Sequence, residues 1–203
     1  MPSITSIDEL RTLYAQPTAR VVKKQIDHLD RHCRNFIALS PFVVMSTVDA
    51  DGNLDTSPRG GEPGFIRVMD ERTLLIPDRP GNNRLDSFRN IIETGKAGFL
   101  FMIPGVTELL RVNGRAELRT NESLKEMCVE QDKLPKVVLS ITVLEAFLHC
   151  AKAIMRSALW KPESQINPKL LPTMGEMMYD ITGGIEPLET PEAMLKRHQA
   201  NLY

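Results

Sequence analysis

The chain has 203 residues, of which 42% are hydrophobic and 25% are charged, and its formal net charge is −1. This length suits one domain with a sizeable core, and this composition excludes disordered and fibrous proteins. A net charge near zero provides no overall field that would attract nucleic acid or an anionic membrane. Any attraction for phosphate must therefore be local.

Targeting signals and a cysteine framework are not evident in the sequence. No apolar run approaches the ~20 residues that span a bilayer, and the first residues lack the basic and apolar regions of a signal peptide. We therefore expect a cytoplasmic protein with neither a membrane nor a nucleic-acid partner. Cys33, Cys128 and Cys150 are far apart and have no CxxC spacing, so we expect buried reduced thiols and no metal site.

The first half of the chain reads as a helical segment followed by hairpins. Apolar residues recur at helical spacing over residues 19–39, and Ser40-Pro41 ends that helix. A weaker helical pattern covers residues 7–14. Alternating and β-branched runs then predict three hairpins, formed by residues 42–48 with 54–57, 65–69 with 72–77, and 97–103 with 108–119. Asn113-Gly114 is typical of a bulge in the last of these strands.

Further elements follow from capping residues and periodicity. A helix over residues 83–94 has Asn82 or Asn83 as its N-cap and Gly95 at its end. The remaining pattern predicts a helix at 121–131, a strand at 136–144, a helix at 146–160, a short helix at 171–179, and a last helix that begins at Thr190-Pro191.

Short strands joined mainly by hairpins favour a mainly β, α+β fold built on an antiparallel six-stranded barrel. We expect a single domain over residues 1–203, with an N-terminal helical segment at about 1–40 and a C-terminal helical extension at about 161–203. Side chains fill the interior of so small a barrel. A large planar ligand would therefore lie outside it, against a wall that a second copy of the chain supplies.

Two arginine-bearing turns are the candidate binding residues. The segment 79–84, Arg-Pro-Gly-Asn-Asn-Arg, combines two guanidinium groups, a glycine that permits close backbone approach, and a predicted helix N-terminus. These groups suit a phosphate monoester, although a capped surface loop with two solvated arginines would have the same composition. The segment 55–61, Asp-Thr-Ser-Pro-Arg-Gly-Gly, lies one hairpin earlier and is an ordinary loop when it is considered alone.

Five blocks, in order, resemble the flavin-binding proteins related to pyridoxamine 5'-phosphate oxidase, and most closely a bacterial subgroup of FMN-binding members. The blocks are residues 55–61, 78–90, 99–105, 110–116 and 149–160. The resemblance covers about residues 26–184. It implies a split β-barrel of the FMN-binding type and a homodimer with FMN at the subunit interface.

The resemblance also implies roles for individual residues. Ser57, Pro58, Arg59 and Gly60 would lie along the flavin and its ribityl chain, and Ile76 and Pro77 would border the ring. The phosphate would be held by Arg79, Asn83 and Arg84. Leu109 and Arg111 would face the cofactor, and the second subunit would contribute Arg156, Ser157 and Trp160.

The chemistry of the flavin agrees with part of this assignment. The ring needs apolar faces and donors near N1 and O2, where negative charge collects on reduction. Arg59 or Arg156 would meet the second need, and Trp160 would cover a face unless it packs in the core or an interface. His149 beside Cys150 offers too few ligands for zinc, so we expect it to orient a neighbour or to be buried between subunits.

The C-terminus departs from the family, because residues 196–203 lack the tryptophan that accompanies the basic substrate-binding segment of the oxidases. We therefore do not expect vitamin B6 oxidation. The leading hypothesis is an FMN-dependent oxidoreductase with an unidentified small-molecule substrate, unidentified catalytic residues, and NADH or NADPH as a candidate electron donor. The alternatives are a non-catalytic flavin-binding or sensing module, or the same barrel binding F420 or haem.

Overall fold

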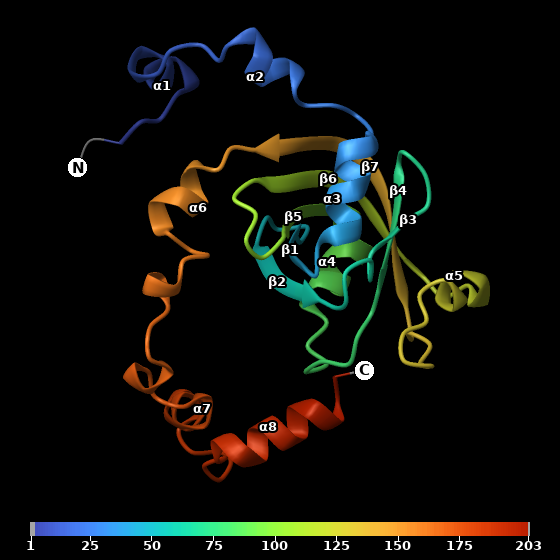
Figure 1. Ribbon diagram of the computed structural model, residues 1–203, viewed down its shortest axis with the longest axis vertical. Helices are drawn as coiled ribbons and strands as arrows, with labels where there is room; N and C mark the ends of the chain where they lie inside the picture. Colours follow the sequence, from blue (N-terminus) through green and yellow to red (C-terminus); the bar gives the residue numbers. More distant parts are fainter. Residues whose placement is uncertain (1–2, 203) are drawn as a thin grey trace.

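The computed structural model describes residues 3–202 (Figure 1). Within them, one antiparallel sheet has the strand order β2-β1-β5-β6-β7-β4-β3. The strands are β1 (Phe42–Val48), β2 (Leu54–Gly60), β3 (Arg67–Val68), β4 (Thr73–Pro77), β5 (Lys96–Met102), β6 (Leu109–Arg119) and β7 (Val138–His149). The predicted hairpins are the pairs β1–β2, β3–β4 and β5–β6.

Helices and 3-10 turns flank the sheet and extend beyond it. They are α1 (Ile7–Leu13), α2 (Ala19–Lys23), α3 (Arg31–Leu39), α4 (Asp86–Thr94), α5 (Glu122–Glu126), α6 (Lys152–Ser157), η1 (Pro162–Ser164), η2 (Pro168–Leu170), α7 (Met174–Thr182) and α8 (Pro191–Ala200). Within residues 3–202, no helix is long and apolar enough to cross a membrane.

The sheet curls around one hydrophobic core. In β1, Val43, Met45 and Thr47 are buried, and the residues that alternate with them are partly or fully exposed. This is the period-two alternation of a strand with one buried face. Phe101 and Leu110 lie in the same cross-strand row as Val43 and point into the same interior. Helices α3 and α4 pack against the sheet and bury Ile37 and Ile91 in this core. The predicted α+β split β-barrel is confirmed, with seven strands instead of six.

The boundary between β7 and α6 differs from the prediction. Residues 146–149 continue β7, and α6 covers only Lys152–Ser157, so the predicted helix over 146–160 is wrong at its start. The cause is pairing with β6, in which Leu109 to Asn113 lie opposite His149 to Glu145. Ladder hydrogen bonds to a long neighbouring strand outweigh an apolar spacing that also fits a helix.

The predicted helix over residues 19–39 is also wrong, because it is broken into α2 and α3. Ile26 and Ala146 exchange two backbone hydrogen bonds of 3.0 and 2.8 Å, so this part of the chain is pinned to β7 in extended form. The second helix then starts afresh, with the Asp30 carboxylate accepting a 2.7 Å hydrogen bond from the amide of Cys33. The break fixes where the N-terminal segment leaves the barrel.

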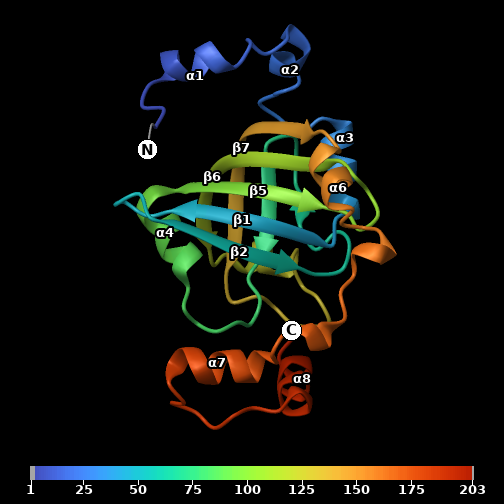
Figure 2. The ribbon, with the colours of Figure 1, turned by 90° about the vertical axis from the view of Figure 1, so that its left-hand side faces the viewer.

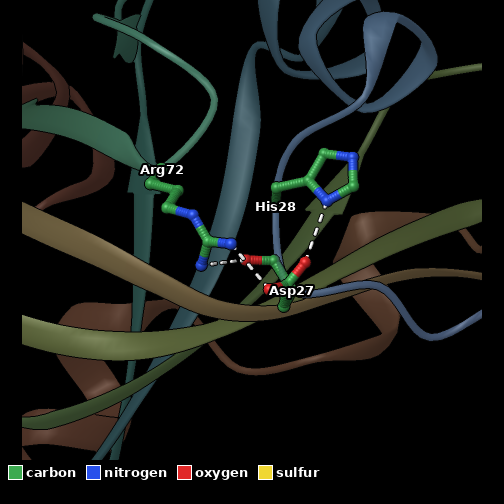
Figure 3. Close-up of polar contacts among 3 residues, drawn as sticks. All are labelled: Asp27, His28 and Arg72. Atoms are coloured by element: carbon green, nitrogen blue, oxygen red, sulfur yellow. Dashed lines mark hydrogen bonds and ion pairs between the residues drawn. The ribbon is translucent and has the colours of Figure 1, made fainter.

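A polar cluster beside this break holds the segment against the β3–β4 hairpin (Figure 3). Arg72 donates to the Asp27 carbonyl oxygen at 2.9 Å and to the Asp27 carboxylate at 2.6 Å, and His28 Nδ1 lies 3.0 Å from the other carboxylate oxygen. Hydrogen bonds from His28 and then Arg72 lower the pKa of Asp27 from 3.8 to about 2. The carboxylate is exposed, so its contribution to stability is modest.

The Asp27 cluster predicts a pH dependence of stability. A carboxylate whose pKa is lower in the folded chain stabilises the fold above its unfolded pKa, and that stabilisation is lost as the pH falls through the folded pKa. We therefore expect the Asp27→Asn variant to have a lower urea midpoint than the wild type at pH 7. The two midpoints should converge between about pH 4 and pH 2. The Asp51→Asn variant in the β1–β2 turn is the control, and a difference at pH 7 that persisted undiminished at pH 2 would contradict the assignment.

The predicted bulge lies where β6 and β7 change register. Asn113 faces Glu145 but Gly114 faces Val143, so Leu144 is the extra residue, on the β7 side. Gly114 is required there, because a Cβ atom at this position would lie 2.3 Å from the Thr142 carbonyl oxygen.

Gly114→Ala should therefore lower the free energy of unfolding by about 1–3 kcal/mol in urea titrations, since a paired backbone carbonyl cannot move aside. The matched control is Gly81→Ala, because a Cβ there has its nearest neighbour, the Arg79 carbonyl oxygen, at 4.0 Å. The control should change stability by less than about 0.5 kcal/mol. Equal effects of the two substitutions would show that the bulge does not need glycine.

Two segments stand away from the barrel. Helices α1 and α2 bury no residue, and Gly175 is the one buried residue of α7 and α8. Figures 1 and 2 show the N-terminal helices beyond one side of the barrel and α7 with α8 beyond the opposite side. Cys33 and Cys128 are buried as predicted, whereas Cys150, at the root of the C-terminal segment, is exposed.

Candidate functional site

The two predicted arginine turns meet in space. Arg59 lies near the end of β2 and Asp78 directly follows β4, and Arg59 Nη1 is 4.0 Å from Asp78 Oδ1. The Arg59 guanidinium also lies over the ring of Phe88 on α4, with its carbon 5.5 Å from the ring centre. Curling of the sheet therefore brings β2, the end of β4 and the first turn of α4 to one place.

Arg59 is a largely buried cation with an unused donor. Its Nε atom is buried and has no hydrogen-bond partner among residues 3–202. Burial lowers the pKa of Arg59, and Asp78 and Asp55 oppose that shift, so the group stays protonated. Burial likewise raises the pKa of Asp78 despite the attraction of Arg59. A contact of 4.0 Å is too long for a hydrogen bond, and it leaves donors of Arg59 available to another anion.

The two arginines predicted to hold the phosphate, Arg79 and Arg84, are each paired with a carboxylate. Arg79 forms a largely buried ion pair with Glu130. Arg84 is 74% exposed, and its Nε donates a 2.7 Å hydrogen bond to Asp86. Arg84 is thus paired at the surface with a neighbour in sequence, whereas the partner of Arg79 is largely buried and comes from a distant segment.

The start of α4 differs from the prediction. The helix begins at Asp86, and its N-cap is Leu85, in the left-handed region at φ 61°. Asn83 is also left-handed, at φ 60°, and the Asn82 side chain accepts a 3.1 Å hydrogen bond from the Arg84 amide. The asparagines therefore form a turn before the helix and do not cap it, and the strong local preference of asparagine for such turns explains why.

A hollow of about 250 Å³ lies between the β1–β2 turn and α4. Its lining residues are Asp49, Asn53, Leu54, Asp55, Arg84, Asp86, Arg89, Asn90 and Glu93. Four carboxylates face two guanidinium groups, and Asp55 also accepts a 2.5 Å hydrogen bond from Ser87 on the first turn of α4. This hollow is therefore poorly suited to a phosphate, whereas the buried Nε of Arg59 is a donor that an anion could use.

A second cluster lies on the outer face of the sheet. Arg111 on β6 donates to Glu145 at 2.5 Å, and its guanidinium carbon stacks 3.9 Å from the ring centre of Phe147. Lys24 contacts the same ring at 5.0 Å, and Asn113 donates to Glu145 at 3.1 Å. As with Arg59, Arg111 Nε is buried without a hydrogen-bond partner in the part of the chain that the structure describes.

The predicted site residues divide between the two faces of the sheet. Arg59 pairs with Val43 and points inward, whereas Pro58 shares a cross-strand row with Val44 and Arg111 and points outward. Opposite residues of paired strands point to the same side. One ligand could therefore contact the inward Arg59 and the outward Arg111 most directly if the two residues came from different copies of the chain.

Several other predicted residues are less accessible. Ile76 and Pro77 are buried, and Ile76 belongs to the core, so these residues would meet a ligand through backbone atoms. Leu109 is 8% exposed on β6. Ser57 is half-buried, and Gly60 ends β2.

The residues predicted to come from the second subunit lie where the C-terminal segment leaves the barrel. The Trp160 indole donates a 2.7 Å hydrogen bond to the Val106 carbonyl oxygen in the β5–β6 turn. Arg156 is exposed and donates to the Lys152 carbonyl oxygen at 3.1 Å, and Ser157 donates to the Ile154 carbonyl oxygen at 3.2 Å. Within residues 3–202, no hydrogen bond or ion pair joins these three side chains to Arg59.

His149 lies beside the outer cluster, with its ring 4.7 Å from that of Phe147. Burial, followed by the charges of Arg111 and Lys24, lowers the pKa of His149 below 6.5. No group of three or more histidine, cysteine or acidic side chains in residues 3–202 is arranged to hold a metal ion. Sequence reasoning missed Glu145 and Phe147. Their alternation with His149 would have revealed them had this stretch been interpreted as a strand.

Comparisons with known proteins show the family of the chain. The family model described as pyridoxamine 5'-phosphate oxidase matches residues 29–150, which is more than half of the chain. None of the curated proteins is significantly similar to the chain.

Solved structures match more than half of the chain. A histidine-to-alanine variant of HupZ from Group A Streptococcus has 22% identity and a TM-score of 0.50, covering 60% of this chain and 99% of HupZ. A pyridoxinephosphate oxidase family protein of Clostridium acetobutylicum, related to general stress protein 26, has 13% identity and a TM-score of 0.46, with coverage of 58% and 85%. HutZ, the haem storage protein of Vibrio cholerae, has 12% identity and a TM-score of 0.40, with coverage of 60% and 93%. The likeness to HupZ shows a shared fold.

Proposed function

Because the chain belongs to the pyridoxamine 5'-phosphate oxidase family, we propose that it is an FMN-dependent oxidoreductase acting on a small organic molecule at a homodimer interface. The observation that carries this proposal is the buried Nε of Arg59, which has no partner in residues 3–202 and lies where two loops and a helix converge. An unsatisfied buried donor is costly, and a ligand anion would satisfy it.

The phosphate of FMN fits the surroundings of Arg59. A guanidinium group presents several donors in one plane, which suits phosphate oxygens. Arg79, which is paired with Glu130, and the exposed Arg84 follow Asp78, the partner of Arg59, in the chain. Arg84 joins the phosphate when it exchanges Asp86 for the ligand, and Asn83 shapes the turn that carries it.

In this proposal, the flavin ring packs against the outer face of the sheet. Val44, Leu100 and Pro58 lie side by side on this face, next to Arg111. An outward face of an antiparallel sheet is normally polar, so an apolar row there is suited to contact with a second copy. On this proposal the partner copy also brings its own Arg156, Ser157 and Trp160 to the ring.

When bound, FMN supplies reversible hydride or electron exchange with a substrate stacked on its exposed face. The chain orients the ring and excludes water from it. A guanidinium near the pyrimidine edge, from Arg111 or Arg156, stabilises the negative charge that this edge gains. Vitamin B6 oxidation is not proposed, because residues 196–203 lack the tryptophan that accompanies the basic substrate-binding segment of the oxidases.

Anaerobic reduction tests the oxidoreductase proposal. Purified protein loaded with FMN is mixed with NADH or NADPH, and the flavin absorbance is followed before and after a quinone or oxygen is added. We expect reduction followed by repeated turnover. Bound FMN that none of these donors reduces would instead favour a passive flavin-binding or sensing module.

A further inference from the structure

The C-terminal arm, residues 161–200, is ordered locally but is hardly packed against its own barrel. Thr173 and Glu176 form a reciprocal capping box at the start of α7, and Thr190 caps α8. Gly175 of α7 lies against the segment just before α8, since an added Cβ there would lie 2.1 Å from the Glu189 carbonyl oxygen, and Arg197 of α8 donates to the Glu189 carboxylate. The arm is therefore a preformed helical hairpin.

The apolar side chains of this hairpin lack a surface to cover them. Those that are about half exposed or more are Ile166, Leu170, Leu171, Met174, Met178, Tyr179, Ile181, Ile185, Leu188 and Leu195. In α7, apolar residues lie on more than one side of the helix. A helix that is apolar around most of its circumference is normally buried, and methionines suit irregular contact surfaces.

The exposed area of the whole chain supports the same conclusion. The chain exposes 14217 Å². A compact monomer of 22.8 kDa exposes about 9,600 Å², so the excess is about 4,600 Å². A standard protein interface removes about 800 Å² from each partner, and obligate homodimers bury more. The excess is therefore ample for a stable dimer with an arm contact.

The direction of the arm indicates which molecule covers it. The Trp160 indole anchors the arm's root to the β5–β6 turn, beside the outer face of the sheet. Figure 2 shows β1, β2, β5 and β6 facing the viewer, with the N-terminal helices above them and α7 and α8 below. In Figure 1, α1, α6 and α7 lie outward on the side of this same face, and α8 runs back beneath the barrel. A molecule seated on the apolar face would lie between the two extensions.

We propose that the C-terminal arm of each copy packs its apolar side against the barrel of a second copy, so that the two chains embrace each other. This inference rests on the homodimer in the proposed function. The root of the arm is anchored to the turn between β5 and β6, two strands that carry the sheet face assigned to that dimer. A twofold axis through this face gives both arms equivalent contacts. The arm then stabilises the dimer and borders the cofactor site between the copies.

Hydrogen exchange of the full chain, followed by mass spectrometry, tests the arm directly. Exchange is measured above and below the concentration at which light scattering shows a dimer. We expect amides of α7 to be protected in the dimer and to lose protection on dilution, because a nine-residue helix that packs only against another short helix exchanges rapidly. A dimer whose α7 exchanges at the unprotected rate would overturn the arm contact while leaving the homodimer standing. A monomer with protected α7 would show that the arm folds onto its own barrel, and would also overturn it.

A pair of charge substitutions gives a second test. Met178 and Ile181 are 49% and 79% exposed in the single chain, so Met178→Glu with Ile181→Glu should leave the barrel folded. We expect the dimer dissociation constant to rise on the order of 100-fold, because buried side chains of this size each strengthen association about tenfold. Gln199→Glu on α8 is the matched control and should leave the dimer dissociation constant unchanged. An unchanged constant for the double variant would overturn the proposal, whereas arm protection in a protein that binds no flavin would overturn the cofactor assignment alone.

Discussion

Replacing Arg59 with alanine should weaken FMN binding by about 1.5–3 kcal/mol, or roughly 10- to 150-fold, because a charge-assisted hydrogen bond in a buried setting is lost. The binding of riboflavin, which lacks the phosphate, should be weakened much less. Isothermal titration of both ligands measures the difference. Arg59→Lys should give an intermediate loss for FMN, since lysine keeps the charge but not the planar set of donors.

The control for Arg59 is Arg115→Ala, which removes an exposed arginine from β6 without touching the site. Arg84→Ala should cost less than Arg59→Ala, since Arg84 is 74% exposed and its charge is screened. Equal losses of FMN and riboflavin in the Arg59→Ala variant would move Arg59 from the phosphate to the ring. Unchanged FMN binding would remove it from the site.

The Val44→Asp variant should abolish the dimer at micromolar concentration. Val44 lies in the apolar outward row between Pro58 and Leu100, and the substitution buries an unpaired carboxylate in the proposed interface. The loss of apolar burial alone corresponds to about 1.5–3 kcal/mol of association free energy. Light scattering and flavin occupancy should fall together, because the ring site needs both copies.

Thr142→Asp is the matched control for Val44. Thr142 is an exposed residue on β7, in the half of the sheet away from the proposed interface. This variant should remain dimeric and retain FMN. A Val44→Asp protein that is monomeric yet binds FMN normally would contradict a site built from two chains.

The hairpins were the part of the fold most accessible from sequence. Asp51-Gly52 is typical of a tight hairpin turn, in which glycine takes a positive φ, and Gly52 has a φ of 89°. This turn makes β1 and β2 neighbours in the sheet. The break between α2 and α3 was not accessible, because nothing in residues 24–30 interrupts the helical spacing. It arises from Ile26 pairing with Ala146, which lies 120 positions along the chain.

In the candidate site, too, features set by local sequence were predictable and features set by distant contacts were not. Local composition predicted Arg79 and Arg84 as anion ligands, the family resemblance added Arg59, and closure of the barrel brings the two turns together. The ion pair of Arg79 with Glu130 and the outer cluster of Arg111, Glu145 and Phe147 depend on contacts between distant segments. The capping role given to Asn83 failed because a local asparagine turn competes with helix capping.

Identification of the ligand released from natively purified protein tests the central claim most directly. Absorbance and mass spectrometry of the denatured sample should show FMN, close to one per chain, with the protein dimeric before denaturation. Release of F420 or haem would contradict the cofactor assignment while keeping the fold. A colourless protein that fails to bind added FMN would contradict the account as a whole.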